Sequence, residues 1–134
     1  MPEELGQINT NTIIVKDGDI ISCWSVAKNN VTATGEWFRR QAGTSSDTCP
    51  FVAVTDMTII AVGITNQVVT TWSVEILADS GTGPVLIHTI TGTADNKQTD
   101  TGLAIDINQG DLISIRQGTG TSTDPSCDIY LKSR

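Results

Sequence analysis

Apolar and polar residues alternate along most of the second half of the chain, from residue 70 to residue 131. In the segment 70–78 (TTWSVEILA), Trp72, Val74 and Ile76 fall on one face, and threonine, serine and glutamate fall between them. Successive side chains of a β-strand point to opposite faces of the sheet. The pattern therefore predicts strands that are buried on one side and face water on the other.

Similar short runs separated by turn residues extend over the rest of the chain. The dipeptide Asp17-Gly18 predicts a tight turn, because such a turn needs a residue with positive φ. The run 57–65 is apolar on both faces, which predicts a central strand covered on two sides. The predicted strands, in chain order, are 12–15, 20–26, 31–38, 51–55, 57–65, 70–78, 85–92, 103–107, 112–116 and 127–131.

This series of short strands, with no helical period between them, predicts an all-β fold. We expect an antiparallel jelly-roll sandwich of two four-stranded sheets, preceded by an N-terminal hairpin. Residues 1–11 show no periodicity and are expected to form an N-terminal arm. Residues 12–134 are expected to form a single β-sandwich domain, in which the polar stretch 39–50 is a loop.

Composition supports this class and excludes some partners. The chain has 134 residues, a hydrophobic content of 38% and a net charge of −7. An acidic balance argues against binding to nucleic acid and to anionic membrane surfaces, which both need clustered Lys and Arg. No apolar run approaches the roughly 18 residues of a membrane span. The polar, acidic N-terminus lacks the features of a secretory signal, so we expect synthesis in a cytosol.

The sequence offers little catalytic chemistry. His88 is the single histidine, and the alternation places it on the face of Leu86 and Ile90. We interpret it as a packed or interface side chain, because no nucleophile or carboxylate motif accompanies it. The expectation is a protein that is not an enzyme and that uses no cofactor and no metal. Aspartates in or beside turns are interpreted as turn residues rather than calcium ligands: Asp17, Asp19, Asp95, Asp100, Asp106 and Asp111.

Three cysteines cannot all pair within one chain. We expect reduced thiols, as is usual in a cytosol. The alternative is one disulfide, for which Cys49 and Cys127 are candidates because both lie in loop-like contexts.

The tryptophans divide into two kinds. Trp72 alternates with apolar residues and is expected in the core. Trp37 precedes Phe38, Arg39 and Arg40, and a Trp–Arg cluster is typical of binding hot spots. A core Trp37 with two solvated arginines is the alternative interpretation.

Four segments together resemble a known family: GEWFRRQAG (35–43), MTIIAVGIT (57–65), TTWSVEILADSG (70–81) and LAIDINQGDLISIRQGTG (103–120). The pattern resembles the small jelly-roll head decoration (cement) proteins of tailed bacteriophages. It is more distantly similar to the trimeric tumour-necrosis-factor-like heads of fibres and spikes. The chain lacks the Tyr-rich strand that lines the threefold axis in that second group.

The resemblance implies a virion structural protein, made in the host cytoplasm and placed on the capsid exterior. It implies a homotrimer whose N-terminal arm reaches onto the major capsid protein, and it carries over no catalytic residue. The apolar residues of the arm and first strand are candidate capsid contacts, together with the Trp–Arg cluster: Leu5, Ile8, Ile13, Ile14, Trp37, Arg39 and Arg40.

Two other functions compete with this one. A receptor- or glycan-binding head of a phage tail fibre or adhesin would share the fold. It would need exposed aromatic and Asp or Asn side chains on its loops, at Trp37 or in the segment 117–126. A small cupin-like enzyme would need several histidine ligands, and one histidine nearly excludes it.

Overall fold

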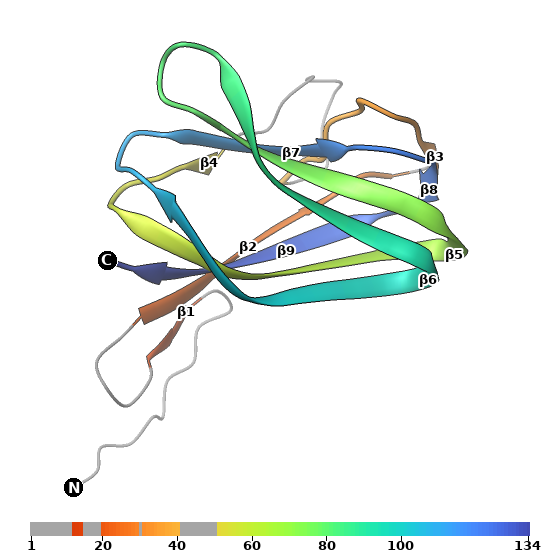
Figure 1. Cartoon of the computed structure of the whole chain (residues 1–134), viewed down its shortest axis with the longest axis horizontal. Helices are drawn as coiled ribbons and strands as arrows, with labels where there is room; N and C mark the ends of the chain where they lie inside the picture. The colour runs from red at the N-terminus through yellow and green to blue at the C-terminus, as the bar shows by residue number, and fades with distance from the viewer. Residues whose placement is uncertain (1–11, 15–19, 30, 41–50) are drawn as a thin grey trace, which may run out of the picture.

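The computed structural model describes residues 12–14, 20–29, 31–40 and 51–134. These residues form an all-β structure in which every strand pairing is antiparallel (Figure 1). The predicted antiparallel jelly-roll sandwich is confirmed. The strands are β1 (Thr12–Ile14), β2 (Ile20–Ala27), β3 (Val31–Thr32), β4 (Phe51–Val52), β5 (Met57–Asp79), β6 (Pro84–Ile107), β7 (Leu112–Gln117), β8 (Ser122–Thr123) and β9 (Ser126–Ser133).

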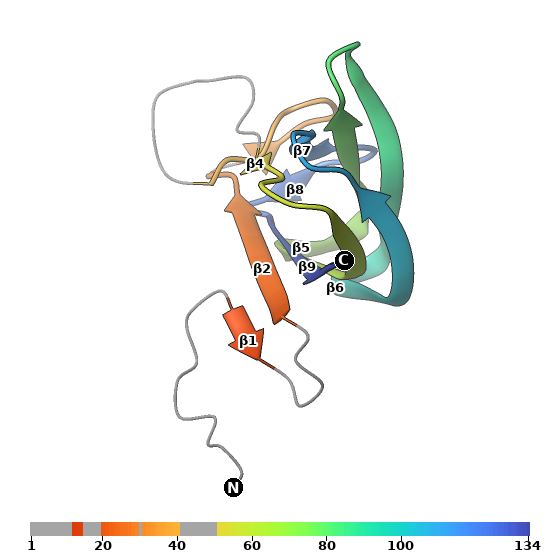
Figure 2. The ribbon, with the colours of Figure 1, turned by 90° about the vertical axis from the view of Figure 1, so that its left-hand side faces the viewer.

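One curled sheet builds both layers of the sandwich. Its strand order is β1-β2-β9-β5-β7-β4, with β6 paired to β5, and β3 and β8 form a separate pair. The first half of β5 pairs with β9 and the second half pairs with β7, while β6 follows β5 through both layers. Figures 1 and 2 show the resulting two layers. The first consists of β2, β9 and the halves of β5 and β6 beside them, and the second of β4, β7 and the remaining halves.

The continuity of β5 and β6 differs from the sequence prediction. We expected separate strands at 57–65 and 70–78, but both belong to β5. Asp95 and Asp100, expected in or beside turns, lie within β6. The two strands bend together at a register shift between Thr65 and Thr70. Because both strands turn the same corner, the hydrogen-bonded ladder resumes beyond it, which a one-chain pattern does not reveal.

The core lies between the layers and is made by alternate residues of the long strands. Trp72, Val74 and Ile76 of β5 are fully buried, so the predicted inward face and the core position of Trp72 are confirmed. The first half of β5 is central, between β9 and β6. Its outward residues are half-buried or exposed, and no element of the described part of the chain forms a third layer over them. The described residues show cover on the inner face of this strand, and cover on its outer face stays a prediction.

One lateral side of the sandwich is closed by the segment before residue 41. Arg39 and Ala27 exchange two backbone hydrogen bonds of 2.8 Å, and the Phe38 amide donates to the Ile115 carbonyl at 2.9 Å. These bonds join β2 of the first layer to β7 of the second. Phe38 is 1% exposed and fills the space between the layers.

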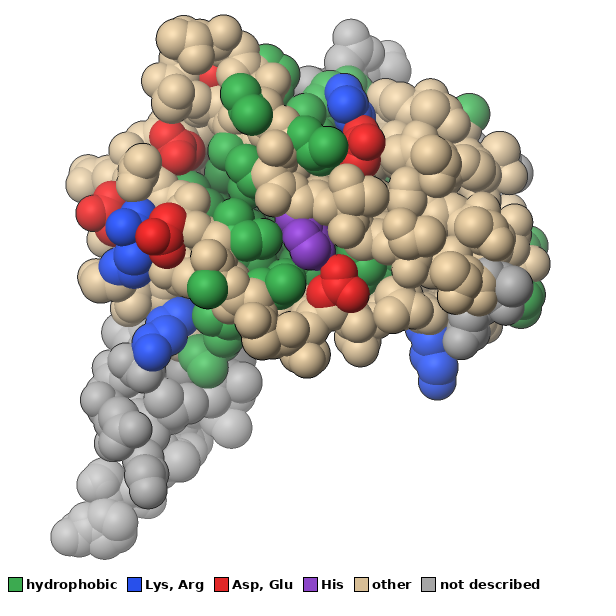
Figure 3. Space-filling model, in the orientation of Figure 1, with side chains coloured by type: hydrophobic (Ala, Val, Ile, Leu, Met, Phe, Trp, Pro, Cys, Tyr) green, Lys and Arg blue, Asp and Glu red, His purple; other side chains and the backbone are tan. Residues whose placement is uncertain are grey.

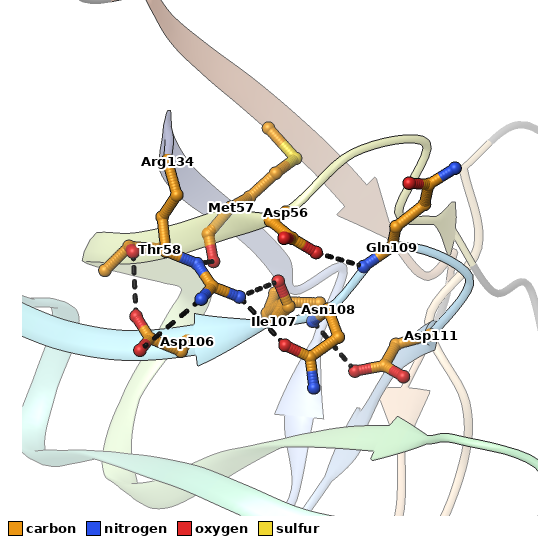
Figure 4. Close-up of polar contacts among 9 residues, drawn as sticks. All are labelled: Asp56, Met57, Thr58, Asp106, Ile107, Asn108, Gln109, Asp111 and Arg134. Atoms are coloured by element: carbon orange, nitrogen blue, oxygen red, sulfur yellow. Dashed lines mark hydrogen bonds and ion pairs between the residues drawn. The ribbon is translucent and has the colours of Figure 1, made fainter.

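Polar contacts of Arg134 join the start of β5 and the end of β6 to the residue that follows β9 (Figure 4). Its guanidinium donates to the Met57 carbonyl at 3.2 Å and to the Ile107 carbonyl at 2.8 Å. It also donates to Asn108 Oδ1 at 2.9 Å. Asp111 accepts from the Asn108 amide at 3.0 Å and fixes the turn between β6 and β7. The rigid frame therefore extends to the end of β9.

Candidate binding surfaces

The outer face of the second layer carries an exposed row of apolar side chains. On β5, Leu77 is out of phase with inward Trp72, Val74 and Ile76, so it points outward. It is nevertheless buried (3%) and does not belong to the main core cluster. Side chains on the outer face therefore cover it.

The register identifies those side chains. Leu77 lies opposite Leu86 of β6. Leu112 of β7 lies opposite Asp79, two residues after Leu77 on β5. Val52 of β4 lies opposite Leu112. Cross-strand neighbours on one face of a sheet are within contact distance, and diagonal neighbours are within reach of long side chains. We name Val52, Leu77, Leu86 and Leu112 the apolar strip; Val52 is 53% exposed, Leu86 47% and Leu112 38%.

The carboxylate of Asp79, next to the apolar strip, is engaged in the β5–β6 turn. Asp79 lies opposite Leu112, and its Oδ1 accepts hydrogen bonds from the amides of Gly81 (2.7 Å) and Gly83 (3.0 Å). Both glycines have positive φ, which the tight β5–β6 turn requires. The carboxylate therefore stabilises the turn.

Trp37 lies on the same outer face, beside the apolar strip. It forms a bridge with Arg116 of β7, whose guanidinium carbon lies 5.6 Å from the centre of the indole ring. Arg116 Nε donates to Glu75 Oε1 at 2.6 Å. The indole is half-buried. Trp37 is thus neither a core residue nor a free anchor, because it is held by a cation–π contact on the rim of the sheet.

The structure separates the two arginines that the sequence grouped with Trp37. Arg39 is half-buried and joins β2 through its backbone. Arg40 is exposed and lies 5.2 Å above the Phe51 ring, which stacks on Trp24 at 4.6 Å. Arg40 therefore covers the lateral side of the sandwich rather than the outer face.

The remaining predicted contacts lie at the N-terminus. Leu5 and Ile8, together with the whole predicted arm, lie outside the described residues. Ile13 and Ile14 belong to β1, where they pair with Ile21 and Ile20 of β2. The expectation of an N-terminal hairpin beside the sandwich is confirmed, and the contact roles of these residues stay predictions.

His88 and Asp100 meet at the opposite lateral side, between the two arms of β6. His88 Nε2 lies 2.9 Å from Asp100 Oδ2, and their side chains are 17% and 32% exposed. His88 lies opposite inward Ile76 and Asp100 lies opposite inward Val62, so the pair joins the two layers. Figure 3 shows His88 with hydrophobic side chains gathered around it and an acidic side chain beside it.

The sequence reading of His88 is corrected in one detail. A register shift between Ile76 and Leu77 places Leu86 opposite Leu77, on the outer face. His88 therefore does not share its face with Leu86, because the bulge interrupts the strict alternation. A packed histidine was expected, but its partner Asp100 was missed, since it lies in the same strand beyond the bend.

The two described cysteines are free thiols. Cys23 and Cys127 are free, so Cys127 is not bridged to Cys49, which itself lies outside the described residues. Burial raises the pKa of the Cys127 thiol, and the nearby Asp128 and Cys23 add to the effect.

In the 117–126 segment, Gln117 is fully buried and accepts a hydrogen bond from the Ser122 hydroxyl at 2.8 Å. That segment holds no aromatic side chain.

The described residues contain no helix that is long and apolar enough to cross a membrane. No group of three or more histidine, cysteine, aspartate or glutamate side chains within them is placed to hold a metal ion.

Comparisons with known proteins give similarity at the level of fold. No protein-family model matches the sequence, and a search of curated proteins gives no match. Among solved structures, the chain is similar to the globular domain of the zebrafish complement 1qA protein, with 10% identity and a TM-score of 0.49 over 81% of this chain and 94% of the other. It is also similar to a structure titled "CBM4 structure and function", with 16% identity and a TM-score of 0.41 over 93% and 76%.

A third similar structure comes from the infectious bursal disease virus Gx strain. Its identity is 13% and its TM-score 0.34, over 99% of this chain and 37% of the other. This chain thus spans little more than a third of that protein. These likenesses concern the β-sandwich architecture alone.

Proposed function

We propose that this chain is a structural attachment module, a capsid decoration protein that binds the major capsid protein as a homotrimer and stabilises the head. The observation that carries the proposal is the outer face of the second layer. There the apolar strip adjoins the Trp37–Arg116–Glu75 cluster. Specific interfaces combine an apolar centre with aromatic and arginine side chains at its margin.

The geometry of this face suits a flat partner. Its residues project from paired strands whose backbone is fixed by continuous ladders, so docking orders few additional groups. Arg116 is held on Trp37 and Glu75 before any partner arrives. A preorganised face of this kind retains more of its contact energy on binding.

Trimerisation would multiply weak contacts. If each copy binds one capsid subunit through this face and its N-terminal arm, three linked contacts raise the overall affinity well above that of one. Bridging of neighbouring subunits then resists their separation, which is how a decoration protein stabilises a shell. The protein would act on the capsid exterior after synthesis in the host cytoplasm.

Co-sedimentation with purified virions of the source phage tests the attachment. The double variant Leu86→Asn, Leu112→Asn is expected to lose virion binding while keeping its far-UV circular dichroism. Val69→Asn is the matched control, because Val69 is also an exposed apolar residue (67%) but lies at the bend of β5, away from the apolar strip. Equal binding by the double variant and the control would refute the assignment of this face.

Two further measurements test the oligomer and the arm. Light scattering is expected to give about three times the chain mass of 14.2 kDa. A monomer at micromolar concentration would contradict the trimer. Deletion of residues 1–11 is expected to abolish virion binding and to leave the fold intact, and unchanged binding would show that the arm is not an attachment element.

A further inference from the structure

The outer face of the first layer differs in character from the face with the apolar strip. It is polar, and it carries one exposed aromatic ring, that of Tyr130 (39% exposed) on β9. The tryptophans and phenylalanines of the chain are buried or half-buried. Tyr130 lies opposite Cys23 of β2 on one side and opposite Ala61 of β5 on the other. The ring thus stands near the middle of a four-stranded face.

On its β2 side, the Tyr130 side chain has Cys23 as its cross-strand neighbour. Electrostatic interaction with Cys23 is the main reason why the pKa of Tyr130 is raised. Partial burial adds to that shift. Because β9 is paired on both sides at this residue, the backbone that carries the ring loses little freedom when a ligand packs against it.

On the β5 side of the ring, the cross-strand neighbours are small. Ala61 and Gly63 occupy the outward positions of β5 beside Tyr130 and Asp128. A Cβ atom added to Gly63 would meet one neighbour within 4 Å, the Thr99 methyl at 3.8 Å. Small side chains therefore leave room between the ring and the outward threonines of β6.

The polar groups around this space hold one another in place. Ser25 Oγ donates to Asp128 Oδ1 at 2.6 Å, and the Thr65 and Ser126 hydroxyls are 2.7 Å apart. Each of these oxygens keeps further lone pairs that can accept hydrogen bonds from outside. The face therefore offers fixed acceptors and hydroxyls beside an apolar ring.

The charge on this face also distinguishes it from the rest of the chain. Across its four strands the outward acids Asp106 and Asp128 are balanced by the bases Lys97 and Lys132. The whole chain carries a net charge of −7. A ligand that matches this face is consequently uncharged and rich in hydroxyl groups, with an apolar side for the ring.

We propose that the face around Tyr130 binds a neutral saccharide. One pyranose ring packs its C–H side on Tyr130 above Ala61 and Gly63, and its hydroxyls hydrogen-bond to Asp128 and Thr99. The site lies on the layer opposite the apolar strip, so a copy docked through that strip would present the Tyr130 face outward. Saccharide binding is thus a separate function from attachment to a capsid.

Calorimetry and ligand-observed NMR test the proposal on the full chain, in reducing buffer at pH 7. The probes are maltohexaose, cellohexaose, chitohexaose and lacto-N-neotetraose, with 3′-sialyllactose as the charged comparison. Saturable binding of at least one neutral probe is expected, with weaker binding of the sialylated one. The absence of saturable binding by every neutral probe up to 10 mM, a concentration chosen to detect about millimolar affinity, would overturn the proposal.

Three variants locate the site for the probe that binds. Tyr130→Ala is expected to weaken binding at least about tenfold, because the stacked ring is lost. Tyr130→Phe retains the ring and is expected to stay within about threefold of the parent chain. Gly63→Val fills the open space and is expected to weaken binding without backbone strain, since Gly63 does not have positive φ. Unchanged binding by Tyr130→Ala and Gly63→Val would refute the assigned site.

Different variants test the capsid proposal and the saccharide proposal. Tyr130→Ala is expected to leave virion co-sedimentation unchanged, while Leu86→Asn, Leu112→Asn is expected to leave saccharide binding unchanged. If the Tyr130 variant loses virion binding as well, the capsid contact includes this face, and the separate saccharide site is refuted.

Discussion

The stabilities of two glycine-to-alanine variants, Gly92→Ala and Gly63→Ala, can be compared to measure how tightly the core packs on Trp72. Gly92 lies opposite Trp72, and a Cβ built on it would be 2.6 Å from the indole Nε1 atom and 3.0 Å from Cδ1. Trp72 is fully buried, so the indole has no room to withdraw. Gly63 provides the matched control, because its nearest neighbour would be 3.8 Å away. Neither glycine has positive φ.

The magnitude follows from two opposing terms. Each substitution reduces the entropy of the unfolded chain, which stabilises the fold by about 0.4–1 kcal/mol when the backbone accepts alanine. At Gly92 the added methyl also overpacks the core, at a cost of about 1–3 kcal/mol. The entropy term is common to both variants and cancels in the comparison. Gly92→Ala is therefore expected to be about 1–3 kcal/mol less stable than Gly63→Ala.

Urea unfolding, followed by tryptophan fluorescence and far-UV circular dichroism, measures this difference. Both variants are expected to unfold with the slope of the parent chain, so that a shift in midpoint reports stability. Free energies of unfolding that agree within about 0.5 kcal/mol, the usual range of neutral surface changes, would refute the close packing of Gly92 on Trp72.

Three further predictions concern the core, a turn and a buried thiol. Trp72→Ala is expected to cost about 3–5 kcal/mol by thermal or urea unfolding; an unaltered transition would place the indole at the surface. Asp79→Ala removes the acceptor of the Gly81 and Gly83 amides and is expected to cost about 1–2 kcal/mol, with Asp79→Asn recovering part of it. The Cys127 thiol, whose pKa burial raises, is expected to resist alkylation in the native state at pH 8 and to react after urea is added. Because the unfolded thiol ionises at about pH 8.5 and the folded one stays protonated, the free energy of unfolding should fall between pH 8.5 and 10 by up to about 1.4 kcal/mol per pH unit. Cys127→Ala should lessen that slope, and an identical slope would contradict the burial of the thiol.

The apolar strip was not predicted from the sequence. Leu77 is the apolar residue in the otherwise polar outward series of the segment 70–78, a signal of a covered outer face that the sequence analysis did not use. Its partners Leu86 and Leu112 come from other strands, and a bulge reverses the expected face of Leu86. A one-residue shift of register moves every following side chain to the other face, so the strip was not predictable from alternation.

The contacts of Trp37 and His88 could also not be predicted from the alternation of apolar and polar residues. Trp37 was identified as a residue of interest, but its partner Arg116 is far along the chain and meets it through a single bridge. Asp100 was interpreted as a turn residue, whereas it faces His88 across the open side of the sandwich. Tyr130 was not singled out, because its prominence depends on the small residues that β5 places beside it.

The sequence by itself determined the class of fold and the inward face of the long strands. Alternation with period two follows from the geometry of a single strand, so Trp72, Val74 and Ile76 were identified as core before any contact was known. The tertiary structure decided how β5 and β6 bend through both layers, which outward residues form the two candidate faces, and which charges meet. Those features depend on register and on contacts between distant residues, and a local pattern of apolar and polar positions carries no information about either.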